Sequence, residues 1–262
     1  MVKRQVGQVT IVAVCIMVFW GIFYVASAKA SKTMFMPADY ELAQINYTAE
    51  QRLAPTKFNG NVRKIVYLTI DDGPSLYSSQ LISILEHYNV PVTHFLIGKN
   101  IEKYPESVKQ YEERGDYIGL HSMTHDYNTL YKKGEAINEM LQVQDLLKSS
   151  LSIESTLFRC PFGSMPGLSK QLRDEAVAAG LRTWDWTIDS NDWKLQNRPS
   201  QIVKTIEKQL NRQTEIILIH EKKGTIDVLP QIIELLIDEG YEFATYDESK
   251  HFTMNFYNDD RL

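Results

Sequence analysis

The sequence contains little cysteine: two residues among 262, Cys15 and Cys160. Cys15 lies within an apolar run near the N-terminus, so we do not expect the two to form a disulfide bond. Such scarcity excludes a disulfide framework, and it excludes a zinc site built from several thiolates. The chemistry of this chain must therefore use other side chains.

Excess positive charge is also lacking. The chain has 28 lysines and arginines against 33 aspartates and glutamates, which gives a formal net charge of −5. Because phosphate binding needs clustered basic side chains, nucleic acid is not an expected partner. Internal repeats and low-complexity tracts are absent too. The hydrophobic content of 44% is enough for one good core at this length.

An apolar run over residues 9–28 follows two basic residues, Lys3 and Arg4. The run is long enough to cross a bilayer as a helix, and the basic flank would stay on the cytoplasmic side. Small-x-small patterns at residues 26–28 and 28–30 would suit a signal peptidase. Residues 1–30 are therefore either a signal peptide or a signal anchor, and the length favours the anchor. A buried core helix is the weakest of the three interpretations.

Strand-like and helix-like patterns alternate from residue 64 onward, after a mixed polar stretch that we interpret as a linker or stalk over residues 31–62. This alternation implies parallel strands with right-handed crossovers, and the number of units fits a closed or nearly closed barrel. We expect the catalytic domain over residues 63–250 and a C-terminal tail over 251–262. The expected strands are 64–70, 91–97, 117–120, 156–158, 182–188, 215–219 and 241–246, and the expected helices lie near 81–88, 106–114, 136–147, 170–179, 201–210 and 228–236.

Two adjacent carboxylates, Asp71 and Asp72, close the first predicted strand within the segment 69–74 (TIDDGP). Side chains of successive strand residues point to opposite faces, but the turn at Gly73 and Pro74 would let both reach one site. One carboxylate could then bind a metal while the other acts as a base. The alternative is a plain turn in which Asp72 caps the next helix.

Two histidines, His121 and His125, follow the predicted strand 117–120. At this spacing they would share one face of a helical turn, as when two imidazoles bind one metal ion. With Asp72 they would complete an Asp-His-His set that suits zinc and its first-row neighbours. A lone histidine is more often structural, and a pair at this spacing is a more specific indication.

The segment 159–163 (RCPFG) follows the predicted strand 156–158. Arg159 could keep Asp71 charged and oriented, because a nearby cation favours the carboxylate. The turn after it could aim a backbone N–H at a developing oxyanion. Taken alone, the segment could equally be a salt-bridged turn, and Cys160 is expected to be a small buried residue rather than a nucleophile.

Tryptophans lie among carboxylates in the segment 184–193 (WDWTIDSNDW), an arrangement that suits sugar binding. Trp184 and Trp186 alternate within the predicted strand, so at least one of them should pack in the core. Trp193, beyond the strand, is the better candidate for a substrate groove. Further along, His220 ends the predicted strand 215–219, and a carboxylate beside it would make it a general acid near neutral pH. By itself, His220 could equally be a core or surface histidine.

Together, the five segments resemble, in the same order, the five motifs of the polysaccharide deacetylase family, also known as the NodB homology or carbohydrate esterase 4 family. The family patterns are T-F-D-D-G-P, H-S/T-x-x-H, R-x-P-Y/F, D-x-x-D-W and L-x-H, and the resemblance covers roughly residues 64–246. Three conservative departures occur: Ile70 replaces Phe, Phe162 replaces Tyr, and Glu221 follows the last histidine where Asp is frequent.

The resemblance implies an α/β fold, a distorted (β/α) barrel of the NodB type. It also implies a divalent metal ion, usually zinc with cobalt, nickel or manganese as alternatives, held by Asp72, His121 and His125. Metal-activated water would then attack the acetamide carbonyl.

The resemblance further assigns catalytic roles. Asp71 would be the general base, oriented by Arg159, and His220 the general acid. A carboxylate of the fourth motif, Asp192 or Asp189, would tune His220, and the sequence leaves that choice open. Substrate contacts are expected from Pro161, Phe162 through its backbone N–H, Trp193 and Leu218.

The expected function is removal of N-acetyl groups from N-acetylglucosamine units of a cell-wall polysaccharide, with peptidoglycan favoured by the outward topology. Chitin-like oligomers and exopolysaccharide are alternative substrates, and a small-ureide amidohydrolase or a silent glycan-binding wall protein are rival functions. A glycosidase is disfavoured, because adjacent Asp71 and Asp72 cannot easily flank a glycosidic bond. We expect an extracytoplasmic monomer, anchored in the membrane through residues 9–28 or secreted.

Overall fold

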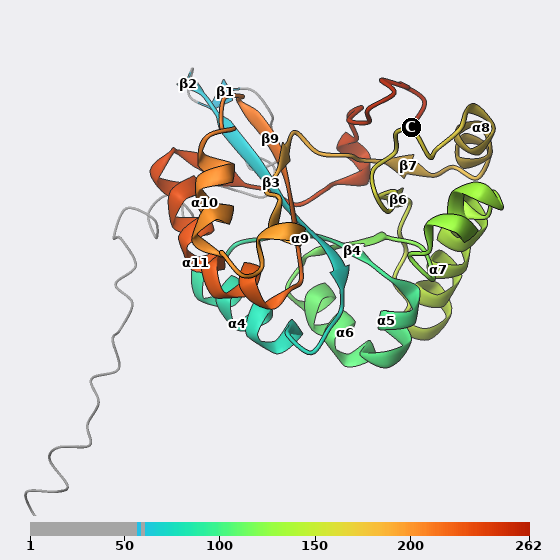
Figure 1. Cartoon of the computed structure of the whole chain (residues 1–262), viewed down its shortest axis with the longest axis horizontal. Helices are drawn as coiled ribbons and strands as arrows, with labels where there is room; N and C mark the ends of the chain where they lie inside the picture. Colours follow the sequence, from blue (N-terminus) through green and yellow to red (C-terminus); the bar gives the residue numbers. More distant parts are fainter. Residues whose placement is uncertain (1–56, 59–60) are drawn as a thin grey trace, which may run out of the picture. The chain divides into compact units, whose positions relative to one another are not determined.

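The structure, a computed structural model, describes residues 57–58 and 61–262 of the chain (Figure 1). The predicted signal segment 1–30 and most of the predicted linker lie outside the described residues. Within the described ranges, no helix combines the length and the apolar character that a membrane crossing requires. A short antiparallel pair, β1 (Lys57–Phe58) and β2 (Asn61–Val62), precedes the main sheet.

The central strand of the sheet is β3 (Lys64–Gly73). On one side it pairs with β9 (Thr214–His220) along most of its length. On the other side β10 (Tyr241–Phe243) pairs with its first half and β4 (Thr93–Leu96) with its second half. All these pairs are parallel, as the alternating pattern predicted.

The sheet continues outward from both sides of β3. Beyond β4 lie β5 (Tyr117–Leu120), β6 (Leu157–Phe158) and β7 (Arg182–Thr183), and beyond β9 lies β8 (Ile188–Asp189). The apolar residues of β3 are buried on both faces of the sheet: Val66, Leu68 and Ile70 on one face, and Ile65 and Tyr67 on the other. An uninterrupted apolar run is what a parallel strand covered on both faces requires.

Helices form the outer layer around the sheet (Figure 1). Successive contacts run in the order α10, α11, α4, α6, α5, α7 and α8. The α4 helix shows why: its buried side chains Leu81, Leu85 and Tyr88 recur at helical spacing and face inward. The bounds are α4 (Ser78–Tyr88), α5 (Gly98–Lys103), α6 (Pro105–Glu113), α7 (Ala136–Leu151), α8 (Lys170–Ala178), α9 (Asp192–Leu195), α10 (Ser200–Glu207) and α11 (Lys223–Asp238), with short helical turns η1 (Asn128–Lys132) and η2 (Glu248–Lys250).

The prediction of one strand over residues 182–188 is wrong. The segment is split into β7 and β8, which lie at opposite ends of the strand order. The residues between them cross from one end to the other: Trp184 pairs with Met254, whereas the Thr187 N–H donates to the Ile216 carbonyl at 2.9 Å. The β-branched and aromatic composition indicates extended backbone, but it does not reveal which neighbour each residue pairs with.

The predicted C-terminal tail, residues 251–262, packs beside β7 and α8 (Figure 1). The Asp185 N–H donates to the Met254 carbonyl at 2.7 Å, and Arg173 of α8 pairs with Asp259 at 3.1 Å. The final residue, Leu262, is fully buried. The C-terminal segment therefore contributes to the packing at this end of the sheet.

Candidate active site

Residues from all five motif segments meet in one pocket of about 390 Å³. The pocket lies where β3, β5 and β9 give way to loops, which is where parallel barrels place their chemistry. Its lining residues are Asp71, Asp72, His121, His125, Cys160, Phe162, Trp186, Asp189, Trp193, Leu218, His220 and Lys222.

The adjacent side chains of Asp71 and Asp72 both reach this pocket because the end of β3 is irregular. The register between β3 and β4 shifts between Asp71 and Gly73, and Asp72 has a left-handed backbone with a φ of 70°. The Asn100 side chain donates to the Asp72 carbonyl at 2.8 Å and holds this conformation. Asp72 does not cap the next helix, because α4 has Tyr77 at its N-cap position and no side-chain cap.

His121 and His125 come together without the predicted helical turn. Ser122 and His125 both have left-handed backbones, with φ values of 63° and 56°, so the segment is not helical. The two ring centroids are nonetheless 5.1 Å apart. The two histidines are therefore close together, as the spacing predicted, but the predicted helical turn is wrong.

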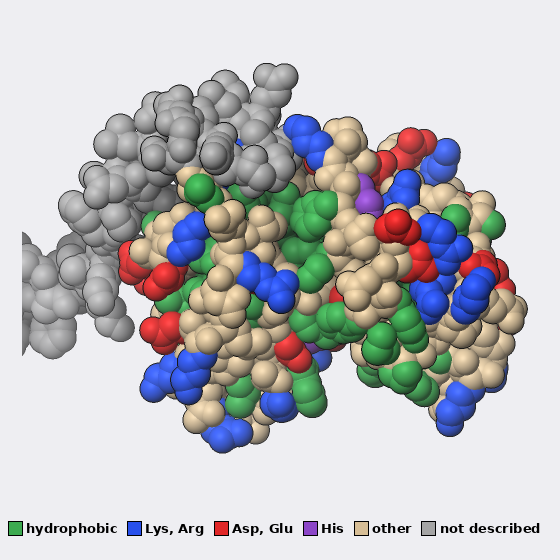
Figure 2. Space-filling model, turned by 90° about the horizontal axis from the view of Figure 1, so that it is seen from above, with side chains coloured by type: hydrophobic (Ala, Val, Ile, Leu, Met, Phe, Trp, Pro, Cys, Tyr) green, Lys and Arg blue, Asp and Glu red, His purple; other side chains and the backbone are tan. Residues whose placement is uncertain are grey.

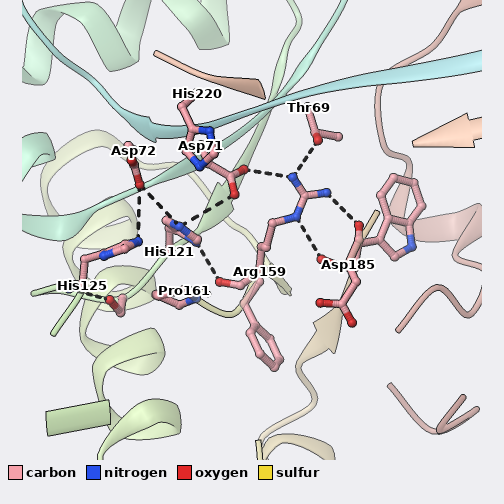
Figure 3. Close-up of polar contacts among 12 residues, drawn as sticks. Thr69, Asp71, Asp72, His121, His125, Arg159, Pro161, Asp185 and His220 are labelled. Carbon is pink, nitrogen blue, oxygen red and sulfur yellow. Dashed lines mark hydrogen bonds and ion pairs between the residues drawn. The ribbon is translucent and has the colours of Figure 1, made fainter. Parts of the chain in front are cut away.

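The candidate metal ligands are Asp72, His121 and His125 (Figure 3). Asp72 Oδ1 lies 3.7 Å from His121 Nε2 and 3.5 Å from His125 Nε2. This oxygen is buried and has no hydrogen-bond partner among the described residues. A buried anionic acceptor without a donor is costly, whereas a cation between the three ligand atoms would satisfy it. The donor set therefore fits a divalent metal ion.

Charge and tautomer also suit these residues to metal binding. His121 Nδ1 lies 2.8 Å from the Arg159 carbonyl, so it carries the proton and leaves the Nε2 lone pair for the ligand role. Burial lowers the pKa of His121 in spite of the nearby Asp71 and Asp72 carboxylates, which favours neutral imidazole. Burial alone would raise the pKa of Asp72, but His121, His220 and Lys222 lower it to about 2.

Asp71 is held by the fully buried Arg159, whose Nη1 donates to Asp71 Oδ1 at 2.9 Å (Figure 3). The same nitrogen donates to the Thr69 hydroxyl at 2.6 Å, and the guanidinium lies 4.2 Å from the centroid of the Phe95 ring. Its other donors go to the carbonyls of Trp184 and Asp185. Arg159 is thus fixed on every side, and Asp71 keeps Oδ2 toward the pocket, 3.8 Å from His121 Nε2.

His220 is paired with Asp192 rather than with Asp189. The ring Nδ1 lies 2.6 Å from Asp192 Oδ1, and the His220 backbone N–H and the Thr225 hydroxyl donate to Asp192 Oδ2. The Asp189 side chain instead accepts the Asn191 N–H at 2.7 Å. Burial alone would lower the pKa of His220, but the hydrogen bond and charge of Asp192 raise it above its ordinary value. Since Nδ1 is occupied, Nε2 is the nitrogen available to the pocket.

The Asp185 side chain stabilises the turn that carries Pro161 and Phe162. This fully buried carboxylate accepts the Ser164 N–H and hydroxyl at 2.9 and 2.6 Å, and the Phe256 N–H at 2.7 Å. Tyr131 donates to the Pro161 carbonyl at 2.8 Å. Phe162 has a left-handed φ of 68°, and within the described residues its N–H donates to no backbone or side-chain acceptor.

Aromatic side chains surround the pocket. Trp193 and Phe162 are the most exposed, at 53% and 57%, whereas Trp184 is buried in the core beside Tyr67. The prediction that at least one of the alternating tryptophans belongs to the core is therefore confirmed for Trp184. Trp186 instead lines the pocket and meets Phe256 edge to face.

Buried apolar groups complete the pocket floor. Leu218 and Cys160 are both buried and both line the pocket. Burial raises the pKa of the Cys160 thiol, so it stays protonated and is a poor nucleophile.

Several residues of the site were missed by the motif analysis. Lys222 and Thr225 lie outside the five segments, and Asp185 lies in the fourth segment but was given no role. Their contacts depend on chain segments far apart in sequence. Trp186 was recognised only as part of a strand. A carboxylate between two tryptophans was the one signal for Asp185 in the sequence, and nothing there singles out Thr225 or Lys222.

Comparisons with known proteins agree with this architecture. A family profile described as polysaccharide deacetylase matches residues 59–184. The peptidoglycan-N-acetylglucosamine deacetylase of Bacillus cereus is 38% identical over 90% of this chain and 87% of its own length. The peptidoglycan-N-acetylmuramic acid deacetylase PdaC of Bacillus subtilis is 29% identical over 70% of this chain and 38% of its own length.

A solved structure gives the same fold. The crystal structure of the polysaccharide deacetylase Bc1974 from Bacillus cereus superposes with a TM-score of 0.74 at 40% identity, covering 76% of this chain and all of that one. The curled parallel sheet with its outer helices is therefore the predicted distorted (β/α) barrel. The chain is similar in sequence to a known member over nearly its whole length, shares the fold, and brings residues of all five motif segments into one pocket. This chain therefore belongs to the polysaccharide deacetylase family.

Proposed function

We propose that this protein is a metal-dependent hydrolase that removes N-acetyl groups from N-acetylglucosamine units of peptidoglycan. One observation carries the proposal: a metal-ligand triad, an arginine-held carboxylate and an aspartate-held histidine line the same pocket. Its similarity to the Bacillus cereus peptidoglycan-N-acetylglucosamine deacetylase supports the choice of polymer and sugar.

The metal site would consist of Asp72, His121 and His125, with zinc as the expected ion. A divalent cation bound there would polarise the acetamide carbonyl and make the attacking water more acidic. The three ligands leave coordination positions open, as catalytic sites require.

Asp71 would act as the general base. Its Oδ1 is occupied by Arg159, so Oδ2 is the oxygen that takes a proton from the attacking water. The buried guanidinium orients the carboxylate and limits its rotation. The water oxygen then adds to the carbonyl carbon of the acetamide.

His220 would act as the general acid. Asp192 fixes the Nδ1–H tautomer and stabilises the imidazolium, so Nε2–H can deliver a proton to the amine nitrogen as the C–N bond breaks. The Phe162 N–H would stabilise the negative charge on the carbonyl oxygen. The products are acetate and a glucosamine unit.

Substrate would lie between the exposed rings of Trp193 and Phe162, whose apolar faces suit the C–H surface of a sugar. Pro161 and Leu218 would also contact the substrate, as the sequence predicted. An outward-facing chain, anchored or secreted, would meet peptidoglycan on the outer side of the membrane. On the face shown in Figure 2, basic and acidic side chains are interspersed.

The test is acetate release by the full-length chain in mild detergent. Peptidoglycan, N-acetylglucosamine oligomers and a small acyclic ureide would be compared, with and without chelator and added zinc, and consumption of the ureide, which contains no acetyl group, would be measured directly. We expect chelator-sensitive acetate release from the glycans and no hydrolysis of the ureide. Hydrolysis of the ureide alone would identify a small-amide hydrolase, and zinc binding without any turnover would identify a silent glycan-binding protein. Mass analysis of the digested glycan would show whether the free amine lies on glucosamine or muramic acid.

A further inference from the structure

The two carboxylate oxygens of Asp72 have different surroundings. Oδ1 faces His121 and His125 and has no hydrogen-bond partner among the described residues. Oδ2 instead lies 3.1 Å from the ammonium nitrogen of Lys222. One oxygen is thus oriented toward the candidate metal position, and the other is already paired.

Lys222 is well placed to maintain this arrangement. Its backbone N–H donates to the His220 carbonyl at 2.8 Å, and its own carbonyl accepts the N–H groups of Thr225 and Ile226 at the start of α11. Among the described residues that line the pocket it is the only lysine or arginine. Its side chain is 39% exposed, so its charge is partly screened by water.

We propose that Lys222 is a positioning residue of the metal site, which holds Asp72 in one-oxygen coordination and weakens the affinity of the site for divalent cations. This inference rests on the metal-dependent function proposed above. With Oδ2 paired to Lys222, Asp72 offers only Oδ1, and a coordination position that a two-oxygen carboxylate would fill stays open for the reaction.

The effect on affinity follows from charge. A fixed ammonium group beside the site repels an incoming divalent cation, and it also stabilises the Asp72 carboxylate before the cation arrives. For charges a few ångströms apart in a medium as polar as water, the repulsion changes a binding constant by roughly tenfold. Because the side chain is partly exposed, added salt should reduce this effect.

The experiment compares three variants of the full-length chain. Lys222→Met removes the charge and the donor, whereas Lys222→Arg keeps both. Lys223→Met is the matched control, because it removes the adjacent charge from a side chain that pairs with Asp227, at 2.7 Å, rather than with Asp72. Zinc affinity would be measured by competition with a chromogenic chelator at low ionic strength and in about 1 M salt, where the screening length is only about 3 Å. The visible absorption of bound cobalt would report on coordination number.

We expect Lys222→Met to bind zinc about tenfold more tightly at low ionic strength and to lose most of that gain in high salt. Its cobalt spectrum should change, while Lys222→Arg and Lys223→Met keep the wild-type affinity and spectrum. Equal or weaker zinc binding by Lys222→Met, or an equal gain in Lys223→Met, would overturn the proposal while leaving the metal-dependent function intact. A wild-type chain that binds neither zinc nor cobalt would overturn both.

Discussion

Neighbouring residues of this chain acquire different chemistry from their surroundings. Asp71 and Asp72 are adjacent in sequence and have the same side chain. Asp71 accepts a hydrogen bond from a buried arginine, whereas Asp72 faces two histidines and a lysine. One is therefore suited to take a proton and the other to bind a cation, and this difference can be tested one residue at a time.

Substitution of Asp71 should separate binding from turnover. We expect Asp71→Asn to keep stoichiometric zinc and to lose roughly 10²–10⁴-fold in kcat, the range for removal of a general base. His125→Ala should lose both the bound zinc and the turnover, because it removes a ligand atom from the candidate triad. Metal content by elemental analysis and acetate release would be measured side by side. Wild-type turnover in Asp71→Asn would remove that residue as the base.

The pH dependence of turnover should identify the partner of His220. A general acid is active below its pKa, and Asp192 raises the pKa of His220 against the opposing effect of burial. Asp192→Asn removes the negative charge, so the pKa should fall and the alkaline limb of the kcat profile should move to lower pH.

Asp189→Asn is the matched control for this measurement. Asp189 also lines the pocket, but its carboxylate accepts the Asn191 N–H and makes no hydrogen bond to the His220 ring. We expect the alkaline limb of the kcat profile of Asp189→Asn to lie at the same pH as in the wild type. A shift in Asp189→Asn with none in Asp192→Asn would reverse the assignment.

Among the elements, the turn after β6 depends most on distant parts of the chain. Asp185, in the crossing segment between β7 and β8, binds both Ser164 of the turn and Phe256 of the C-terminal segment. The backbone carbonyl of Asp185 also accepts a hydrogen bond from Arg159. Asp185 therefore connects the candidate oxyanion turn with the C-terminal segment through its carboxylate, and it contacts Arg159, which orients the proposed general base, through its backbone carbonyl.

Asp185→Ala should destabilise the protein and impair turnover together. The substitution leaves the buried Ser164 N–H and the partly buried Phe256 N–H without an acceptor, which should lower the free energy of unfolding by about 1–3 kcal/mol. Urea denaturation would measure this, and kcat should fall because the turn loses its support. Asp174→Ala is the control, since that exposed carboxylate pairs only with surface Lys170 and Arg261. The urea concentration at the midpoint of unfolding of this variant should stay at the wild-type value. Wild-type stability in Asp185→Ala would contradict the supporting role.

At the scale of the whole molecule, the candidate metal ligands come from the C-terminal ends of two different strands of one sheet and the loop that follows one of them. Asp72 lies at the end of β3, and His121 and His125 follow β5. The apolar core of that sheet, including Val66, Leu68 and Ile70, is formed without any contribution from the ligands. The fold should therefore survive metal removal, unlike that of small domains that need zinc to fold.

Chelation should accordingly abolish activity but not structure. We expect a chelator to stop acetate release while the circular dichroism spectrum stays native, and zinc to restore turnover. Because a ligand of the folded state alone stabilises that state, zinc at about 100 times its Kd should stabilise the protein by about 2.7 kcal/mol, seen as a higher Tm. Loss of native structure on chelation, or turnover by a chain shown to be metal-free, would contradict this expectation.

Much of the fold was predictable because local patterns and the final environment agree. The β-branched run of β3 became a strand buried on both faces, and residues 117–120 form β5 with the predicted bounds. The segment 182–188 was not predictable in the same way. Its composition indicates extended backbone, but its division between two ends of the sheet depends on hydrogen bonds to Met254 and Ile216, which local sequence does not encode.

The sequence by itself determined which motif residues meet in the pocket, because order along the chain and the C-terminal ends of parallel strands already place them at one edge of the sheet. Only the tertiary structure decided between Asp192 and Asp189 as the partner of His220, and it alone placed Asp185 under the turn and Lys222 beside Asp72. These choices depend on distances of a few ångströms between segments far apart in sequence. Within the candidate metal triad, left-handed backbones at Asp72, Ser122 and His125 set the distances between the ligand atoms. Neither residue spacing nor hydrophobic pattern carries that information.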